Sequence, residues 1–399
     1  MTPMHSESPT SRGAASPSPL PRAEPLTAAE RERYARHLVI PEVGVEGQTK
    51  LKSARVLVVG AGGLGAPLLS YLAAAGVGTI GVAEFDRVER SNLQRQVLFS
   101  EADLGREKAV AVREAIGRIN PSVQVELHPG LTQTNALDLV RGYDVVADGT
   151  DNFHARYLVN DACVLAGVPN VYGSVHRFEG QVSVFGAPGG PNYRDLYPEP
   201  PPPELAPSCA EAGVLGVMPG IVGALQGAEV LKLLLGIGEP LVGRVLLVDA
   251  LAMRFRSFAV HPDPANPLTG DAPTITVPTA PPRAVCAPSM ASVPEITVRD
   301  LKDRLDRGET PFILDVREPH EYEIANLGGA LVPLGSLPDR VDELREHQHD
   351  DLVVVHCRSG GRSANAVAYL REQGFENAVN LKGGTLAWSD EIDPSMLKY

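Results

Sequence analysis

One short segment constrains the fold of this chain more than any other: an apolar strand that runs into a glycine turn and then into a helix. Residues 54–60, Ala-Arg-Val-Leu-Val-Val-Gly, are apolar and rich in valine, and Gly60-Ala-Gly-Gly-Leu-Gly65 opens a helical stretch that continues to Ala75. Residues 79–84 are strand-like again. This order predicts a βαβ unit, the building block of a Rossmann-like doubly wound α/β sheet.

The glycines of this turn indicate a nucleotide site. Gly60, Gly62 and Gly65 match the dinucleotide-binding pattern, in which small residues let backbone N–H groups approach a phosphate at a helix N-terminus. Glu84 follows 19 positions after Gly65, where a carboxylate can accept hydrogen bonds from ribose hydroxyls. These residues fit an NAD-dependent oxidoreductase and an ATP-using enzyme equally well.

Proline-rich stretches divide the 399 residues into domains. Six prolines fall within residues 1–26, which predicts a disordered tail, and nine fall between His261 and Pro294, which predicts a linker over 261–293. The folded parts are then 27–260 and 294–399. The tail contains no apolar signal-peptide core, so we expect a cytoplasmic protein. A net charge of -13 argues against a general nucleic-acid binder.

One apolar run, Val214 to Gly236, approaches the length of a membrane span. It contains Pro219 and several glycines, and it carries Glu229 and Lys232 near its end. We therefore predict a buried helix here rather than a membrane segment.

Residues after the second strand suit a polyphosphate chain. The run Ser91-Asn-Leu-Gln-Arg-Gln96 is followed by Lys108 on a helix-like stretch, 13 residues after Arg95. A guanidinium and an ammonium neutralise a triphosphate and a leaving pyrophosphate better than they serve hydride transfer, which favours ATP. Taken singly, Arg95 and Lys108 also fit solvated surface charges.

A further strand, residues 143–148, runs into Gly149-Thr-Asp-Asn152. Carboxylates at the carboxyl end of a parallel strand face the ligand crevice, so Asp151 is a candidate to hold Mg²⁺ against phosphate oxygens. The alternative is an Asx turn that caps the next helix.

Together these motifs resemble one family. Residues 33–48, Arg-Tyr-Ala-Arg-His-Leu-Val-Ile-Pro-Glu-Val-Gly-Val-Glu-Gly-Gln, complete the pattern formed by the glycine turn and by the runs at 91–96 and 149–152. It is similar to the adenylyltransferases that activate ubiquitin-like sulfur carriers, molybdopterin-synthase adenylyltransferase above all. The resemblance implies that the Gly-Gly carboxylate of a carrier attacks the α-phosphate of Mg·ATP, giving an acyl-adenylate and pyrophosphate.

The resemblance also implies roles for single residues. Gly63 would contact the nucleotide, Glu84 the ribose, and Asp151 would hold Mg²⁺ with Asn152 beside it. Arg36 would reach in from the other protomer of a homodimer. The residues implied in ATP binding are Arg36, Gly60, Gly62, Gly63, Gly65, Glu84, Asp86, Ser91, Asn92, Leu93, Gln94, Arg95, Lys108, Asp151 and Asn152, with Arg95 and Asp151 also implied in catalysis.

Two departures from the family stand out. The family usually has Asp where this chain has Glu84, and Asp86 could share the ribose contact. Many members also carry two Cys-x-x-Cys pairs that bind structural zinc, whereas this chain has Asn192-Tyr-Arg-Asp195 and no cysteine in the stretch after Phe258. We therefore expect no zinc there, because the soft or imidazole ligands are missing.

The chain has four cysteines. Cys209 lies in a proline-rich stretch that we interpret as a crossover loop, and two-domain relatives have a cysteine there that is implied to form an acyl thioester or a disulfide. The alternative is a half-buried residue at a loop end. Cys163 lies in an apolar helix-like run and is expected in the core, and Cys286, in the linker, has no assigned role.

Cys357 directly follows a strand-like run, 351–356, and starts the loop Cys357-Arg-Ser-Gly-Gly-Arg362, after which Ser363 to Gln373 is helix-like. Consecutive N–H groups of such a loop form a nest that stabilises a sulfur anion. Cysteine phosphatases use the same device with Cys-x5-Arg spacing, but the spacing here is Cys-x4-Arg and gives a tighter ring of amides. The loop residues are Arg358, Ser359, Gly360, Gly361 and Arg362.

This small α/β domain resembles a rhodanese, through residues 315–322, the Cys357 loop and residues 381–388. The resemblance implies that Cys357 accepts sulfane sulfur from thiosulfate or a cysteine desulfurase. Asp315, Arg317 and Glu321 are expected to support the scaffold.

The combined prediction is ATP-dependent adenylation of a carrier, followed by transfer of sulfur from a Cys357 persulfide to give a thiocarboxylate, as in molybdenum cofactor biosynthesis or a related pathway. The alternative is an activator for protein conjugation that works through Cys209, with the rhodanese domain as a regulatory or binding module.

Overall fold

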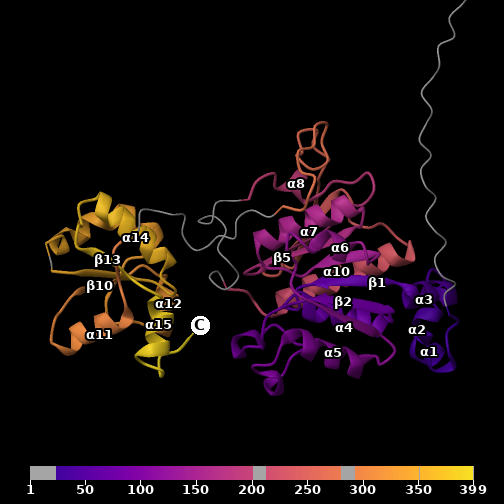
Figure 1. The fold of residues 1–399 in the computed structure, drawn as a ribbon, viewed down its shortest axis with the longest axis horizontal. Coiled ribbons are helices and arrows are strands. Elements are labelled where there is room, and N and C mark those ends of the chain that lie inside the picture. The colour runs from indigo at the N-terminus through magenta and orange to yellow at the C-terminus, as the bar shows by residue number, and fades with distance from the viewer. Residues whose placement is uncertain (1–23, 201–212, 280–292, 350, 399) are drawn as a thin grey trace, which may run out of the picture. The chain divides into compact units, whose positions relative to one another are not determined.

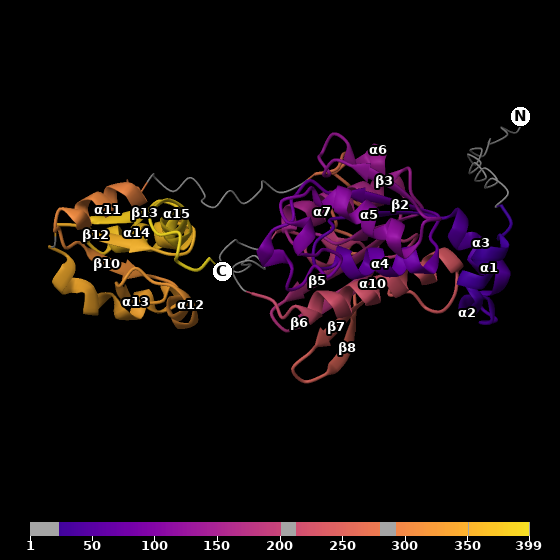
Figure 2. The ribbon, with the colours of Figure 1, turned by 90° about the horizontal axis from the view of Figure 1, so that it is seen from below.

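The chain forms two compact units that divide between Pro281 and Pro282. The structure is a computed structural model, and it describes residues 24–200, 213–279, 293–349 and 351–398. The predicted tail falls within these ranges only at residues 24–26, where Leu26 is buried. Figures 1 and 2 show each unit as a sheet covered by helices.

The large unit contains the predicted βαβ segment. Its strands are β1 (Arg55–Val59), β2 (Thr79–Ala83), β3 (Gln124–His128), β4 (Val145–Asp148), β5 (Asn170–His176), β6 (Glu179–Phe185), β7 (Arg244–Asp249) and β8 (Arg254–Ala259). Its helices are α1 (Ala28–Arg33), α2 (Ala35–Leu38), α3 (Gly44–Ser53), α4 (Gly65–Ala75), α5 (Lys108–Ile119), α6 (Ala136–Val140), α7 (Phe153–Ala166), α8 (Tyr193–Leu196) and α10 (Val217–Leu235), with short 3₁₀ turns at Arg90–Asn92 and Glu101–Asp103.

The sheet of the large unit has two halves. Its strand order is β3-β2-β1-β4-β5-β6-β7-β8. The first five strands are parallel, as the doubly wound prediction requires, and β6 to β8 extend the sheet in antiparallel fashion. The predicted parallel half is thus confirmed, whereas the antiparallel extension was not predicted from the sequence.

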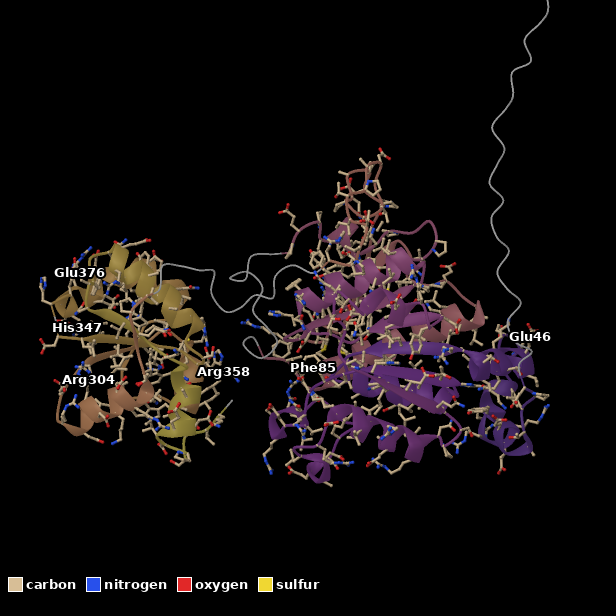
Figure 3. The ribbon with its side chains drawn as sticks, in the orientation of Figure 1. Glu46, Phe85, Arg304, His347, Arg358 and Glu376 are labelled. Atoms are coloured by element: carbon tan, nitrogen blue, oxygen red, sulfur yellow. The ribbon has the colours of Figure 1, made fainter. Side chains whose placement is uncertain are left out.

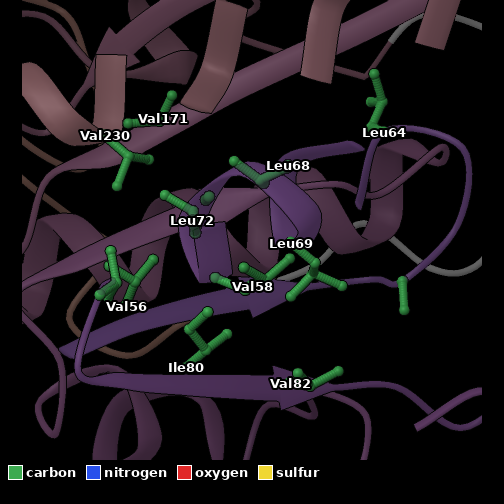
Figure 4. Close-up of a cluster of buried hydrophobic side chains, with 14 of the residues drawn as sticks. Val56, Val58, Leu64, Leu68, Leu69, Leu72, Ile80, Val82, Val171 and Val230 are labelled. Atoms are coloured by element: carbon green, nitrogen blue, oxygen red, sulfur yellow. The ribbon is translucent and has the colours of Figure 1, made fainter. Parts of the chain in front are cut away.

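Alternating side chains of β1 explain why helices cover both faces of this sheet. Val56 and Val58 point to one face, where they join a cluster with Leu68 and Leu72 of α4 (Figure 4). Leu57 belongs to a second cluster, formed with residues of α6 and α7 on the other face. A strand that is buried on both faces reads as a continuous apolar run, as residues 56–59 do.

The long apolar helix α10 packs into this core. Met218, Val222 and Val230 are fully buried, and Gln226 Nε2 donates to the carbonyl oxygens of Asp148 and Val171 at 2.8 and 3.0 Å. By length and composition alone α10 could cross a membrane. Its buried residues and its hydrogen bonds to the sheet agree with the predicted core helix.

The small unit is a five-stranded parallel sheet with the order β11-β10-β12-β13-β9. Its strands are β9 (Glu295–Ile296), β10 (Phe312–Asp315), β11 (Ala330–Leu331), β12 (Val353–His356) and β13 (Ala378–Leu381). Its helices are α11 (Val298–Asp306), α12 (Pro319–Ile324), α13 (Leu337–Arg340), α14 (Gly361–Glu372) and α15 (Gly384–Glu391), with 3₁₀ turns at Leu334–Ser336 and Val341–His347. Cys357 follows the central strand, β12.

The structure differs from the prediction at the linker. Residues 261–279 were expected to belong to it, yet Asn266 and Leu268 are buried, and Thr279 donates through its N–H and its hydroxyl to Asp161 of α7 at 3.0 and 2.7 Å. This segment is therefore part of the large unit, because it contributes buried residues and bonds to Asp161, a fully buried residue of that unit.

Candidate active sites

The glycine loop needs its glycines because backbones pass very close to one another. Gly60 has a φ of +87°, and a Cβ there would lie 3.0 Å from the carbonyl oxygen of Gly149. A Cβ on Gly65 would lie 2.2 Å from the carbonyl oxygen of Gly60. Gly65 is the first residue of α4, so the packing holds the loop against a helix N-terminus, where backbone N–H groups favour an anion.

Glu84 closes this loop from the side of β2. Its Oε2 accepts from the N–H of Ala61 at 2.9 Å, and its Oε1 accepts from the N–H groups of Phe85 and Asp86 at 2.7 and 2.9 Å. The carboxylate thus holds the loop through both of its oxygens, a role that the sequence did not predict.

The predicted phosphate-binding residues lie around the same loop. Lys108 begins α5 with its side chain only 6% exposed, and its Nζ lies 3.3 Å from Asp86 Oδ2. The alternative of a solvated surface charge is therefore wrong for Lys108. A Cβ on Gly63 would lie 3.6 Å from Cγ of Arg95, so that arginine lies across the loop.

The other residues of the 91–96 run have structural partners. Asn92 is buried, and its Oδ1 accepts from the N–H of Glu89 at 3.2 Å. Leu93 packs against the hydrophobic core, and Gln94 lies against Gly216 at the start of α10. The hydroxyl of Ser91 is exposed and lies 3.4 Å from a carboxylate oxygen of Glu89. These contacts fix the run beside the glycine loop.

The end of β4 adds carboxylates to this edge of the sheet. Asp148 is fully buried, its Oδ1 accepts from the N–H and the hydroxyl of Thr150 at 2.9 and 2.6 Å, and burial raises its pKa. Asp151 and Asn152 are exposed. Asn152 caps α7 by accepting from the N–H of Ala155 at 2.9 Å, so the capping alternative is correct for Asn152.

Arg36 lies at the opposite edge of the same unit. It is exposed on α2, and α3 ends directly before β1 begins, at the amino end of the parallel strands. Figure 3 shows the same separation, with Glu46 of α3 at one end of the large unit and Phe85, next to Glu84, at the other. The structure therefore does not bring Arg36 to the glycine loop of its own chain.

The residues at the family's zinc positions do not fit a zinc ion. Asp195 accepts from the N–H of Asn192 at 2.7 Å, from the N–H of Asp263 at 2.9 Å and from Asn266 Nδ2 at 2.6 Å. Asn192 Nδ2 donates to Thr269 Oγ1 at 2.9 Å. These polar atoms satisfy one another, and across the described ranges no group of three or more His, Cys, Asp or Glu side chains is placed to hold a metal.

In the small unit, two groups donate to the sulfur of Cys357. The N–H of Gly360 lies 3.2 Å from Sγ and the hydroxyl of Ser363 lies 3.3 Å from it. Thr385 and Leu386, at the start of α15, donate their N–H groups to the carbonyl oxygens of Cys357 and Arg358, both at 3.0 Å. Two loop carbonyls are thus held on α15, while the Gly360 amide is directed to the sulfur.

Charged residues fix the rest of this loop. Arg362 donates through both terminal nitrogens to Glu321 at 2.7 Å. Burial by itself would raise the pKa of Glu321, but hydrogen bonds from Arg362 and from the backbone of Glu318 outweigh it and lower that pKa. Arg358, labelled in Figure 3, is half-buried, and Ser359 is exposed.

A buried ion pair lies beneath the Cys357 loop. Arg317 is fully buried, and its Nε donates to Asp315 Oδ1 at 2.9 Å. His356, the residue before Cys357, is also fully buried, with Nε2 3.6 Å from Asp315 Oδ2. Burial lowers the pKa of His356 to about 4, although the charge of Asp315 acts in the opposite direction. No sequence pattern predicted a role for this histidine.

The remaining cysteines give no third site within the described residues. Cys163 is fully buried in α7, as predicted. Cys209 and Cys286 lie outside the described residues.

Family models match both units. Residues 34–268 match the ThiF family, and residues 297–391 match the rhodanese-like domain. The chain belongs to the ThiF family. Membership of this family supports ATP binding, and the rhodanese-like match covers the whole Cys357 loop.

Relatives that match nearly the whole chain carry both activities in their names. The chain is 50% identical over 390 residues to the probable adenylyltransferase/sulfurtransferase MoeZ of Mycobacterium tuberculosis, covering 95% of this chain and 98% of that protein. It is 42% identical to the mouse adenylyltransferase and sulfurtransferase MOCS3, with coverage of 96% and 90%. This ThiF-family chain is thus an enzyme of the adenylyltransferase/sulfurtransferase class.

Two further relatives match the large unit. The sulfur carrier protein adenylyltransferase of Thermus thermophilus is 55% identical over 254 residues, which are 62% of this chain and 94% of that protein. The structure of the E. coli biosynthetic enzyme MccB in complex with N-formylated MccA has a TM-score of 0.53 and 24% identity, covering 60% of this chain and 75% of that one. This likeness supports the fold alone.

Proposed function

We propose that this enzyme adenylates the C-terminal Gly-Gly carboxylate of a ubiquitin-like sulfur carrier and then converts it to a thiocarboxylate with sulfur from a Cys357 persulfide. One observation carries the proposal: a loop suited to a phosphate chain and a cysteine suited to a sulfur anion occur on the same chain. Adenylation makes the carboxylate electrophilic, and the persulfide is the nucleophile that uses it. Relatives named for both activities, and one named for a sulfur carrier, support this pairing.

In the adenylation step, a carboxylate oxygen of the carrier attacks the α-phosphorus of ATP, and the bond to the bridging oxygen of pyrophosphate breaks. The amides at the start of α4 and the charges of Arg95 and Lys108 neutralise the phosphate oxygens and the leaving group. Glu84 holds the loop and accepts from the ribose. Asp151, an exposed oxygen ligand at the same edge, would hold Mg²⁺, which supplies charge neutralisation when it is bound.

In the sulfur step, the Cys357 thiolate attacks the sulfane sulfur of a donor, thiosulfate for example. An S–S bond forms, the sulfur–sulfur bond of thiosulfate breaks, and sulfite leaves with the electron pair. The terminal sulfur of the persulfide then attacks the acyl carbon of the adenylate and displaces AMP. A second thiol reduces the resulting acyl disulfide, attacking Cys357 Sγ so that the thiocarboxylate leaves. We propose Cys209 as this thiol. The Cys209–Cys357 disulfide that forms is returned to two thiols by an external thiol reductant, which is oxidised to its own disulfide.

Conjugation through Cys209 is the alternative function, with the small unit as a regulatory or binding module. The two hydrogen-bond donors on Cys357 Sγ argue against it, because a binding module has no need of a stabilised sulfur anion. A carrier that becomes attached to a second protein, with Cys357→Ala fully active, would support the alternative.

We also propose that the enzyme is a homodimer in which Arg36 of one copy serves the nucleotide of the other. The arginine and the glycine loop lie at opposite ends of the parallel strands, which supports a role for Arg36 at a site on a second copy. Val39 and Val45, on the same short stretch, are 74% and 45% exposed and would be covered by a partner. Subunit exchange between Arg36→Ala and Asp151→Ala chains should restore adenylation in the mixed dimer if this is correct.

A reducing compartment suits this chemistry, because the thiol of Cys357 must stay free to accept sulfur. We therefore keep the cytoplasm as the proposed location, to be tested by cell fractionation.

The adenylation proposal is tested by exchange of pyrophosphate into ATP, with and without a Gly-Gly-terminated carrier. We expect exchange that requires the carrier and is lost in Asp151→Ala. The matched control is Asp138→Ala, because Asp138 is an exposed aspartate on α6 whose side chain is 86% exposed. Exchange that is equal in both variants would contradict the role of Asp151.

A further inference from the structure

The sulfur of Cys357 is almost fully enclosed, so its neighbours decide its charge state. Cys357 is 1% exposed, and within the described part of the chain one backbone amide, at Gly360, and one hydroxyl, at Ser363, donate to Sγ. A hydrogen bond to the charged form of a thiol favours that form. The amide is fixed by the loop, whereas a hydroxyl rotates about its C–O bond.

The hydroxyl of Ser363 has one proton but lies within hydrogen-bond distance of three acceptors. Its Oγ lies 3.3 Å from Cys357 Sγ, 2.7 Å from Asn380 Oδ1 and 3.2 Å from the carbonyl oxygen of Gly360. A hydroxyl has one proton and can donate strongly to one acceptor at a time. Ser363 is fully buried in α14, so no solvent molecule can take its place without opening the core.

The competing acceptor is held in place from the other side. Asn380, in β13, is 2% exposed, and its Nδ2 donates to Glu295 Oε1 of β9 at 3.1 Å. This bond turns Oδ1 of Asn380 toward Ser363. The hydroxyl thus lies between a neutral amide oxygen and the reactive sulfur, with a fixed distance to each.

We propose that Ser363 is a positioning residue for sulfur transfer, whose hydroxyl turns from Asn380 Oδ1 to Cys357 Sγ when that sulfur becomes a thiolate. The inference rests on the proposed role of Cys357 as the sulfur acceptor. A thiolate accepts a hydrogen bond more strongly than a neutral amide oxygen, so the Ser363 hydroxyl reorients toward Sγ when that sulfur is charged. The serine proton is not transferred: the thiolate attacks the sulfane sulfur, the donor's S–S bond breaks, and the leaving group departs with the electron pair.

The charged groups around the loop do not replace this hydroxyl. Arg362 is directed to Glu321 through both terminal nitrogens, and Arg317 is directed to Asp315. The other titratable or charged groups of the loop and of β9, β12, α14 and α15 all stay unchanged when only Ser363 is altered: these are Glu295, His356, Arg358, Tyr369, Arg371, Glu372, Asp390 and Glu391.

The experiment measures alkylation of Cys357 by iodoacetamide in the full chain as a function of pH, read by mass spectrometry of the peptide that contains this residue. For Ser363→Ala we expect the midpoint of the profile to move up by about one pH unit, and the rate at neutral pH to fall about tenfold. Transfer of sulfur from thiosulfate to cyanide should lose kcat by a similar factor, with little change in KM. An unchanged profile would overturn the proposal.

Asn380→Ala should shift the alkylation midpoint in the opposite direction, and it tests the proposal even if Ser363→Ala folds poorly. Without its competing acceptor, the Ser363 hydroxyl donates to Sγ at all times, so the alkylation midpoint should move to lower pH. If Ser363 served packing alone, Ser363→Ala and Asn380→Ala would shift the alkylation midpoint in the same direction, and that result would also overturn the proposal. Ser363→Thr, which keeps the hydroxyl, should restore much of the wild-type profile.

Ser389→Ala is the matched control. Ser389 is a buried serine of α15 in the same unit, and its hydroxyl donates to the carbonyl oxygen of Met396 at 2.9 Å. It should lose stability without any shift in the alkylation profile. Alkylation reports the sulfur itself, so it separates failure of this inference from failure of the proposed sulfur-transfer function, which Cys357→Ala tests.

Discussion

His356 makes the stability of the small unit depend on pH. Its pKa is about 4 in the folded chain, against an ordinary value of 6.5, because burial disfavours the imidazolium. Between these two values the unfolded chain binds a proton that the folded chain does not. The free energy of unfolding therefore rises with pH across this window and falls as the solution is acidified.

The size of the effect follows from this difference. Each pH unit inside the window changes the free energy of unfolding by up to about 1.4 kcal/mol, so acidification from pH 7 to pH 5 should cost about 2 kcal/mol. With a urea m-value of about 1–2 kcal/mol/M, this lowers the unfolding midpoint by about 1–2 M. The carboxyl groups of the small unit with lowered pKa values, such as Glu321, lose their contributions only at lower pH.

The assay is urea unfolding followed by tryptophan fluorescence. Trp388 is the only tryptophan of the chain, and it is 9% exposed in the core of the small unit, so its emission reports that unit in the full-length protein. His356→Leu should remove most of the difference between pH 7 and pH 5, whereas His320→Gln, at an exposed histidine, should keep it. Equal pH dependence in wild type and His356→Leu would refute the reasoning.

Three further predictions concern the large unit. Gly65→Ala should abolish the protection that ATP gives against thermal unfolding, because the added Cβ would lie 2.2 Å from the carbonyl oxygen of Gly60. Gly117→Ala should keep that protection, because the space around its Cβ is open. Asp161→Ala should lower the free energy of unfolding, measured with denaturant, by about 3–5 kcal/mol, because it removes the carboxylate that pairs with buried Arg194. A decrease below about 1 kcal/mol would contradict this. A metal chelator should leave the midpoint of thermal unfolding unchanged, because hydrogen bonds from Asp263 and Asn266 to Asp195 join the two segments that a zinc ion would join. A lower midpoint together with zinc released into solution would disprove this.

The features that sequence patterns predict well here are those set by local backbone geometry. Gly60 and Gly65 are required by a positive φ and by a close approach of backbones, and both leave a clear mark in the sequence. Cys357 is recognisable because a strand, a glycine-containing loop and a helix follow in order. The parallel half of the large sheet follows for the same reason.

Features that depend on distant partners were not predictable. Asp195 lies about 70 residues before its partners Asp263 and Asn266, and the polar, proline-rich segment around those partners has the composition of a linker. The roles of Glu84 in holding the glycine loop and of His356 beneath the cysteine loop depend on which backbone groups the fold brings near them. Local sequence carries no sign of these contacts.

The most direct test of the central claim is the intact mass of a Gly-Gly-terminated carrier after incubation with ATP, Mg²⁺, thiosulfate, a thiol reductant and the enzyme. The account predicts that sulfur replaces one oxygen of the C-terminal carboxylate with the wild-type chain. With Cys357→Ala the carrier should be adenylated but should gain no sulfur. Thiocarboxylate formed at the wild-type rate by Cys357→Ala would contradict the account, because the small unit would then not be the sulfur donor.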